Sequence, residues 1–361
     1  MTVLLQTPAG GIVDQVRHKR MIIIAGSLAL ALGALLIWWK TSRIAVLSAQ
    51  LLIGGAAPFL GPALAAITMG LVGRSAFDAQ FGRNQSSNAA GNVAAALLAL
   101  AISHYLGDRE IFMAAACLVV PAILSTLLIR PAEIDYELAR GGRERLTSGR
   151  EQTLAMLAHD RVLLLFLVCC FFFHLANAAM LPELGEMLSR RNARTAVPFM
   201  TACVMVTQIV ISFTAASVGL LAQRYGRRRL LLVGFGVLPI RAVLYTLTDH
   251  PWALVLIQCL DGIANTIFTV VAVLVVADRT RGTGRFNLAA GALATAVGAG
   301  AALSNTYGGY LIHLFGFRIS FLGLGGVALV AFLLVFLFVP ETKSKKPAEQ
   351  VALEPVLREI N

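Results

Sequence analysis

Two full charges, Arg241 and Asp261, lie deep inside strongly apolar segments of the sequence. A charge in hydrocarbon costs about 2.5 to 3.5 kcal/mol on insertion scales, so it is kept where it pairs or has a function. At the rise of an α-helix, the two depths differ by roughly 7 Å, within reach of an arginine side chain. Two interpretations stay open. Asp261 is a proton or substrate-cation site that Arg241 tunes, or the two form a structural ion pair.

Other polar residues also lie inside apolar segments. His174 and Asn177 are three residues apart, and Glu183 follows toward the end of the same segment. A histidine there can titrate and couple proton movement to another process, or it can be a hydrogen-bonded packing residue. Gln208 and Asn265 are neutral hydrogen-bonding groups, suited to substrate recognition or to bonds between helices. The same two interpretations hold for Asn88 and Asn92, which are four residues apart.

No catalytic or metal-ligand pattern is evident among the reactive residue types. All five cysteines fall inside apolar runs, and none has the spacing of a metal site or of a paired loop. We therefore expect small packing residues at these positions, and we expect neither an enzyme nor a cofactor.

A short loop occurs twice in the chain. Residues 8–20 read PAGGIVDQVRHKR and residues 217–229 read SVGLLAQRYGRRR, an offset of 209 that aligns Gly219 with Gly10 and Gln223 with Asp14. Asp14 can cap a helix N-terminus and pair with basic residues. The loops therefore predict a latch between helices, although basic residues that only fix orientation explain them as well. The predicted latch residues are Gly10, Asp14, Arg17, Lys19, Gly219, Arg227 and Arg228.

Composition fixes the environment of the chain. Apolar residues make up 58%, charged residues 14%, and the mean hydropathy is +0.77, which is typical of a membrane protein. The apolar runs suit helices of about 20 residues, and the alternation of a β-barrel is absent. The net charge of +11 does not indicate a nucleic-acid partner, because the basic residues are scattered among apolar segments.

Hydropathy predicts ten complete spans, and a polar loop at residues 74–83. Most of the 30 lysines and arginines lie in one set of alternate connecting segments, which we expect to be cytoplasmic. The predicted domains are an N-terminal bundle, 1–130, a cytoplasmic linker, 131–160, a C-terminal six-helix bundle, 161–342, and a cytoplasmic tail, 343–361. The spans are 21–39, 44–73, 84–106, 111–129, 162–188, 197–222, 230–247, 252–277, 286–314 and 319–339.

These features together resemble a known family. A Gly-x-x-x-Asp turn followed by basic residues, once per half, is similar to the signature loop of the major facilitator superfamily. A second repeat, QLLIGGA at 50–56 and QCLDGIA at 258–264, supports duplicated halves. The polar linker, the glycine- and proline-rich stretch at 54–62 and VPETK at 339–343 agree. The resemblance covers the whole chain and implies an all-α fold of two pseudo-symmetric bundles.

The sequence departs from the usual pattern of that family in three places, and these departures limit the function that we expect. Family members usually have twelve spans, so the resemblance implies that the first helix and part of the second are missing, and that residues 1–13 form a partial helix. Ala49 and Gln50 stand where the drug-antiporter subset carries an arginine, and Asn92 stands where it has a proline. Both departures weaken proton-coupled drug export specifically.

The resemblance implies a secondary transporter that works by alternating access in the inner membrane. We expect proton-coupled export of a small organic solute by a monomer whose partners are that solute and the lipid bilayer. The alternatives are proton-linked uptake of a metabolite and a truncated membrane fragment that does not transport.

Overall fold

The computed structural model describes residues 2–142, 160–191 and 193–343, and within these ranges it contains helices and no strand. This confirms the predicted all-α class. The N-terminal half comprises α1 (Thr2–Gln15), α2 (Lys19–Trp39), α3 (Arg43–Tyr105) and α4 (Glu110–Leu128). Two short 3₁₀ helices follow, Pro131–Glu133 and Leu138–Arg140. The C-terminal half comprises α6 (Arg161–Asn177), α7 (Met180–Arg191), α8 (Ala193–Tyr225), α9 (Arg227–Tyr245), α10 (Pro251–Arg279), α11 (Phe286–Phe315) and α12 (Phe317–Phe338).

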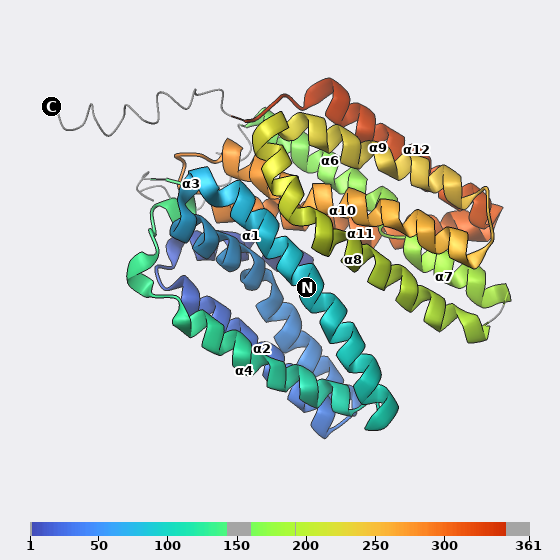
Figure 1. Ribbon diagram of the computed structural model, residues 1–361, viewed down its shortest axis with the longest axis horizontal. Coiled ribbons are helices and arrows are strands. Elements are labelled where there is room, and N and C mark those ends of the chain that lie inside the picture. Colours follow the sequence, from blue (N-terminus) through green and yellow to red (C-terminus); the bar gives the residue numbers. More distant parts are fainter. Residues whose placement is uncertain (1, 143–159, 192, 344–361) are drawn as a thin grey trace.

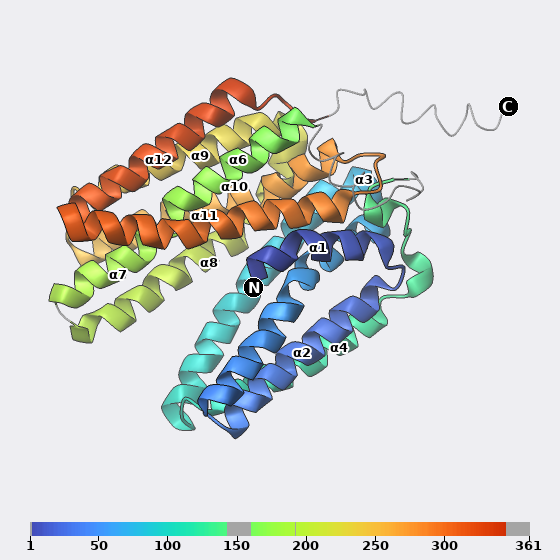
Figure 2. The ribbon, with the colours of Figure 1, turned by 180° about the vertical axis from the view of Figure 1, so that it is seen from behind.

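The helices form two bundles, α1 to α4 and α6 to α12 (Figures 1 and 2). The bundles meet along two seams, where α3 packs against α8 and α1 packs against α11. They lie together at the end that carries the middle of α3 and the α10–α11 turn, and their other ends point apart (Figure 1). We call the joined end the basic end, because the signature loops lie there.

The number of spans agrees with the hydropathy pattern once two helices are considered individually. By length and composition, eight helices of the described part are suited to cross a membrane. One of them, α3, is two helices joined at Gly73, where φ is 69°. A ninth helix, α9, is less apolar because it carries three consecutive arginines and Arg241. Dividing α3 and counting α9 gives the ten predicted spans.

The predicted polar loop at 74–83 is wrong, because this segment is helical and continues α3. One side of the segment is packed against other helices, whereas Ser75 and Arg83 are exposed. Phe77, Asp78 and Phe81 are buried, and Gln80 Nε2 donates to Asn84 Oδ1 at 3.0 Å within the helix. Hydropathy alone does not distinguish a polar loop from a polar helical turn that packs against the other bundle.

The C-terminal bundle is built around α10, most of whose residues are buried. Its Phe268 packs against Phe173 of α6 and Phe235 of α9, with Phe173 and Phe268 stacked at 4.5 Å between ring centroids. On α4, by contrast, leucines such as Leu124 and Leu128 are exposed. In a bilayer such side chains contact lipid, so packing between helices relies on small residues and polar bonds.

The described ends of the predicted linker contact both halves. Asp135 N donates to Gly70 O at 3.0 Å, and Gly282 N donates to Gly141 O at 2.6 Å. Asp160 caps α6 and pairs with Arg279 at 2.8 Å. Burial acts to raise the pKa of Asp160, but hydrogen bonds from Arg279 and from the backbone hold it below its usual value. Residues 143–159 and 344–361, which belong to the predicted linker and tail, lie outside the described residues.

Candidate functional site

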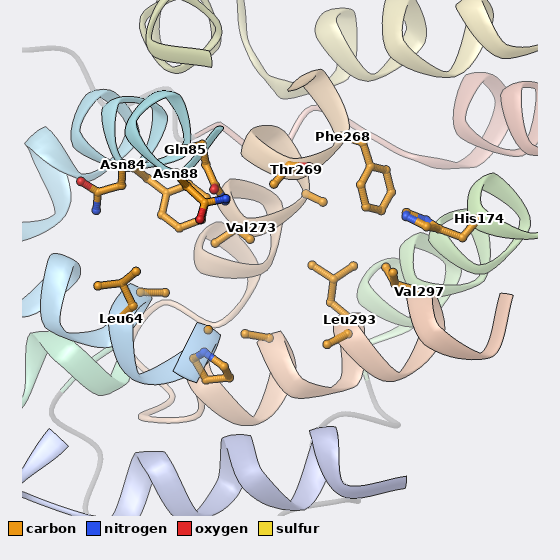
Figure 3. A pocket seen from close by; sticks show the side chains of 17 residues that line it. Leu64, Asn84, Gln85, Asn88, His174, Phe268, Thr269, Val273, Leu293 and Val297 are labelled. Carbon is orange, nitrogen blue, oxygen red and sulfur yellow. The ribbon is translucent and has the colours of Figure 1, made fainter. Parts of the chain in front are cut away.

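A cavity of about 460 Å³ lies between the two halves. Both parts of α3 line it from the N-terminal half, and α6, α10 and α11 line it from the C-terminal half (Figure 3). Asn84, Gln85 and Asn88 stand together on α3, whereas His174 and Phe268 stand together on the opposite side. The size is within the range of small-molecule sites, and a cavity at the interface between helical bundles is a common place for one.

The walls of this central cavity are mostly apolar and carry no full charge. Among the described residues that line it, none is Asp, Glu, Lys or Arg. Alanine, leucine, valine and proline side chains surround the amides of α3 and the hydroxyl of Thr269. Such a lining favours a neutral molecule, because a charged one would be buried without a counter-charge.

His174 offers a hydrogen-bond acceptor to this cavity. Its Nδ1 lies 3.4 Å from the carbonyl oxygen of Cys170. A carbonyl only accepts, so this contact favours a hydrogen on Nδ1 and an open lone pair on Nε2. The ring meets Phe268 edge-on at 4.6 Å between centroids, which fixes its position on the cavity wall.

Arg241 and Asp261 form a buried ion pair between α9 and α10. Asp261 also accepts from Thr207 Oγ1 at 3.3 Å and from Gln258 Nε2 at 3.2 Å, and Asn265 Nδ2 donates to the Asp261 backbone oxygen at 3.1 Å. Asp261 is therefore bonded by four polar residues, namely Arg241, Thr207, Gln258 and Asn265. The cluster lies inside the C-terminal bundle, and Asp261 is not among the residues that line the cavity.

The remaining predicted coupling residues lie apart from one another. Gln208 Oε1 accepts from Asn92 Nδ2 at 3.0 Å, a bond that crosses the α3–α8 seam. Asn177 Oδ1 and both carboxyl oxygens of Glu183 are buried without a hydrogen-bond partner. Of the seven residues predicted for substrate or proton coupling, only His174 therefore lines the central cavity.

The first copy of the repeated loop places Asp14 against the N-terminus of α11. Asp14 Oδ1 accepts from Asn287 N at 3.1 Å and Asn287 Nδ2 at 2.7 Å, and Oδ2 accepts from Leu288 N at 2.8 Å. These amides carry the partial positive charge of a helix start. Burial raises the pKa of Asp14 to about 6, and the hydrogen bonds from Leu288 and Asn287 offset that only in part.

The other predicted residues of the first copy differ in their contacts. A Cβ on Gly10 would lie 2.0 Å from Asn287 O, so only glycine allows α1 to approach α11 this closely. Lys19 is buried and its Nζ donates to Val13 O at 2.6 Å and Val16 O at 3.2 Å, which closes the end of α1. Arg17 is exposed. The contact between halves in this copy is thus made by Gly10 and Asp14.

The second copy joins the halves through ion pairs. Arg227 is buried and contacts Asp78 of α3 at 2.6 Å and Asp278 of α10 at 2.9 Å. Arg74 of α3 pairs with Asp278 as well. A Cβ on Gly219 would lie 2.5 Å from Asp78 O, so glycine is required at this contact too.

Arg228 faces the end of α12 rather than the other half. Its Nη2 donates to Phe336 O at 2.7 Å, and its backbone N donates to Glu341 Oε2 at 3.2 Å. Glu341 Oε1 accepts from Arg227 N at 2.9 Å, so this carboxylate caps the start of α9. Arg228 therefore fixes the loop within its own bundle.

The sequence interpretation missed several residues of these two sites. Asp78 had a usable signal, because it is the only acidic residue between Asp14 and Asp108. Arg74 lies four residues before it, a spacing that places both on one helical face. Asn84 and Gln85 begin the predicted span 84–106, directly after the predicted loop, and nothing in their spacing marked them as site residues. Phe268 had no signal beyond its apolar surroundings.

Comparison with known proteins covers almost the whole chain. The family model described as Major Facilitator Superfamily matches residues 1–219 and 179–360. Uncharacterized MFS-type transporters from two strains of Mycobacterium tuberculosis, CDC 1551 / Oshkosh and ATCC 25618 / H37Rv, are each 39% identical over 342 residues. Each alignment covers 94% of this chain and 82% of the relative.

The fold agrees with solved structures of the same family at low sequence identity. FucP, an MFS transporter in the outward conformation, superposes with a TM-score of 0.75 at 14% identity, covering 95% of this chain and 87% of that chain. The human organic anion transporter MFSD10 (TETRAN) gives 0.67 at 15% identity, covering 92% and 80%. With the family model and the mycobacterial relatives, these observations show that the chain belongs to the Major Facilitator Superfamily, whose members are membrane transporters and not enzymes.

Proposed function

We propose that this chain exports a small, neutral, amphipathic organic solute across the inner membrane as a monomer, and that proton entry drives the export. The observation that carries this proposal is the central cavity between the halves, whose described lining combines amides, a histidine and apolar side chains without a full charge. In this proposal the basic end faces the cytoplasm, as the distribution of lysines and arginines predicts.

The two ends of the molecule support alternating access. At the basic end, Asp14 and Arg227 bond across the halves, whereas the opposite ends of the bundles point apart (Figure 2). Breaking these contacts while the opposite ends close would expose the cavity to the other side. A transporter needs two such states of similar free energy.

The walls of the cavity support the substrate class. The amides of Gln85 and Asn88 offer donors and acceptors on one side, beside Asn84, whose amide is bonded to Gln80 and Thr68. His174 Nε2 accepts on the other side. Phe268 and the aliphatic residues offer an apolar surface between them. A molecule with a ring and a few hydroxyl or amide groups matches this arrangement.

The test uses the full chain in proteoliposomes with an imposed pH gradient. The probes are radiolabelled chloramphenicol, which is neutral and carries a ring, hydroxyls and an amide, together with ethidium as a cation and fluorescein as an anion. We expect gradient-driven movement of chloramphenicol above that in protein-free liposomes. Asn88→Leu should reduce it, whereas Asn305→Leu, at an exposed position of α11, should not. Movement of a charged probe alone would overturn the neutral-substrate proposal.

Proton-linked uptake is the second candidate. It has one specific observation in its favour, because the E. coli fucose:proton symporter FucP shares this fold at 13% identity, with a TM-score of 0.72. Reversing the pH gradient in the same liposomes separates the two directions of coupling. Absence of flux in both directions for every probe would support a membrane protein that does not transport these molecules.

A further inference from the structure

Glu183 is a carboxyl group buried in the outer part of the C-terminal bundle, at the end opposite to the basic end. Only 4% of the residue is exposed, and neither carboxyl oxygen has a hydrogen-bond partner. A carboxylate in such a position would lose its hydration without compensation, whereas a protonated carboxyl loses much less. The packed position therefore favours the neutral form.

The surrounding helices make room for this side chain. On α11, Gly308 lies so close that a Cβ there would be 1.8 Å from Glu183 Oε1 and 3.1 Å from the Ala179 side chain. Ser320 Oγ of α12 donates its hydrogen to Gly308 O at 3.2 Å, and Ser304 Oγ of α11 accepts from Ala179 N at 2.9 Å. We call Ala179, Ser304, Gly308 and Ser320 the niche of Glu183. Both niche hydroxyls bond to backbone groups, and that of Ser320 also lies near the Glu183 carboxyl group without meeting hydrogen-bond geometry.

No cation neutralises Glu183 in the described part of the chain. On α7, Glu186 lies one turn further on and pairs with Arg190 at 2.7 Å. The charge of Arg241 on α9 is paired with Asp261, and its Nη2 contacts Met180. Among the titratable or charged groups on α7 and on the helices near it are Glu186, Arg190, His174, Cys169 and Cys170 on α6, Cys203 on α8, Arg241 and Tyr245 on α9, Tyr307, Tyr310 and His313 on α11 and Arg318 on α12.

The helix before Glu183 is irregular at two residues. α6 ends at Asn177 and α7 begins at Met180, although Ala178 between them keeps helical dihedrals and its N donates to His174 O at 3.0 Å. Asn177 Oδ1 is also buried without a partner at this irregularity. A local irregularity is a place where the outer part of a helix can bend relative to the inner part.

An outer pocket of about 380 Å³ lies near the niche, although neither Glu183 nor a niche residue lines it. Met187, which lies one turn beyond Glu183, and Phe321, which follows Ser320, both line it, together with Arg190 and Arg318. One helical turn is about 5.4 Å. A proton arriving from this end therefore has a short distance to travel.

We propose that Glu183 is the proton-binding site of the transporter, loaded from the outer pocket, and that its protonation allows α7 to pack into the niche on α11 and α12. In this step a hydronium ion of the outer pocket transfers its proton to a Glu183 carboxylate oxygen and leaves as water. Ionisation reverses the step and favours a position of α7 in which the carboxylate meets water. The proposal deepens the proposed function and rests on it, because it names the residue that couples the proton to the movement.

The first test measures the carboxyl group itself in the substrate-free protein. Infrared difference spectra of the full chain in nanodiscs, recorded between neutral and alkaline pH, should contain a band of a buried protonated carboxyl that disappears on alkalisation. Glu183→Gln should remove this band. The matched control is Glu186→Gln, which changes an exposed, paired carboxyl one turn away and should leave the band intact. A band that persists in Glu183→Gln would overturn the proposal.

A second variant tests the niche without removing the carboxyl group. Gly308→Ala should displace the Glu183 side chain and replace the buried band by that of a solvated carboxyl, because the added methyl occupies its place. A buried band that is unchanged in Gly308→Ala would show that the niche is not its site. Loss of the wild-type band on replacing potassium by sodium at constant pH would also overturn the proposal, because the site would then bind sodium.

The transport arm separates this inference from the proposed function. In proteoliposomes, chloramphenicol exchange without a gradient should survive in Glu183→Gln, while the pH-driven component should fall to the level of protein-free liposomes. Preserved pH-driven flux in this variant would overturn the role of Glu183 and leave the proposed function intact. If the protein moves no probe but keeps the Glu183 band, the proposed function is contradicted and the protonation of Glu183 is not.

Discussion

The two copies of the repeated loop join the halves of the molecule with the charges exchanged. In the first copy the loop supplies a carboxylate, Asp14, and the facing helix supplies an amide, Asn287. The offset of 209 that relates the loops also relates Asn287 to Asp78. In the second copy the loop therefore carries the amide, Gln223, and the facing helix carries the carboxylate, Asp78.

This exchange explains why the two copies use different partners. The carboxylate of Asp14 is satisfied by backbone amides at the start of α11 and by Asn287. Asp78 is satisfied instead by the guanidinium of Arg227 from the second loop. Gln223 makes only one exposed hydrogen bond across the seam, from its Nε2 to Ser75 O at 3.1 Å. The two copies therefore share the backbone of the loop, but each neutralises its buried carboxylate with different groups.

The largest effect is expected from Arg227→Ala. It leaves the buried Asp78 without its cation, whereas Asp278 keeps Arg74, and breaking a buried pair costs about 3 to 5 kcal/mol. Spin labels at His18→Cys and Arg281→Cys, in a background without native cysteines, should report separation of the halves at the basic end. Arg224→Ala, at an exposed position, is the control. If Arg224→Ala separated the halves as much as Arg227→Ala, the second copy would act through its overall positive charge and not through the ion pairs of Arg227.

A smaller effect, common to both copies, is expected from their glycines. Gly10→Ala places a methyl within 2.0 Å of Asn287 O, and Gly219→Ala places one within 2.5 Å of Asp78 O. Overpacking of this kind costs about 1 to 3 kcal/mol. Thermal unfolding in detergent and the same label distances measure it. Gly55→Ala, where a methyl would meet nothing within 4 Å, should be neutral, and a loss there equal to that at Gly10 would argue against close approach as the cause.

The first copy should respond to pH through Asp14. Its pKa is raised to about 6 in the latched state, from an ordinary value of 3.8. Between these two values the latched state holds a proton that an open state lacks. Acidification from about pH 7 to about pH 5 should therefore favour the latched state by about tenfold, and the gain is lost as pH rises through 6.

The label distances measured across this pH range test the prediction for Asp14. Asp14→Asn should flatten the pH response that comes from this residue, because an amide does not titrate. Gln223→Ala in the second copy should leave the response unchanged. An undiminished response in Asp14→Asn would assign the pH dependence to another group.

The smallest effect is expected from Gln223→Ala itself. Its side chain makes one exposed hydrogen bond, and changes at such positions usually alter stability by less than about 0.5 kcal/mol. The fraction of latched protein should hardly change in the distance measurement. A shift as large as that of Arg227→Ala would show that the amide, rather than the ion pairs, holds the second copy.

The pattern of the sequence was sufficient to predict the helical membrane fold and to locate the two repeated loops. Long apolar runs predict spanning helices because the backbone in lipid must satisfy its own hydrogen bonds. The repeat of Gly10 and Asp14 as Gly219 and Gln223 predicted a latch between helices at these loops, and the structure adds that the contacting helices belong to different halves. The depth argument for Arg241 and Asp261 also places them within pairing distance, because helical rise converts residue number into depth.

Other residues of the candidate sites lay beyond such local reasoning. The segment 74–83 was predicted as a loop because it is polar, although its polar face packs against the second bundle. Asn84 and Gln85 follow at the start of the predicted span 84–106, and only the continuation of α3 shows that they reach the cavity. The isolation of Glu183 likewise follows from Gly308, 125 residues later in the chain, and no periodicity connects the two.

The sequence by itself determined the helical membrane class, the number and approximate positions of the spans and the positions of the paired loops, because these follow from hydropathy and spacing along one chain. Only the tertiary structure decided which groups meet. Asp14 reaches Leu288 across 274 positions, Arg227 reaches Asp78, and five spans converge on one cavity. The physical reason is that contacts between helices depend on how the shapes of two helices fit together and on what that fit buries. Both are properties of a pair of helices and cannot be read from either helix alone.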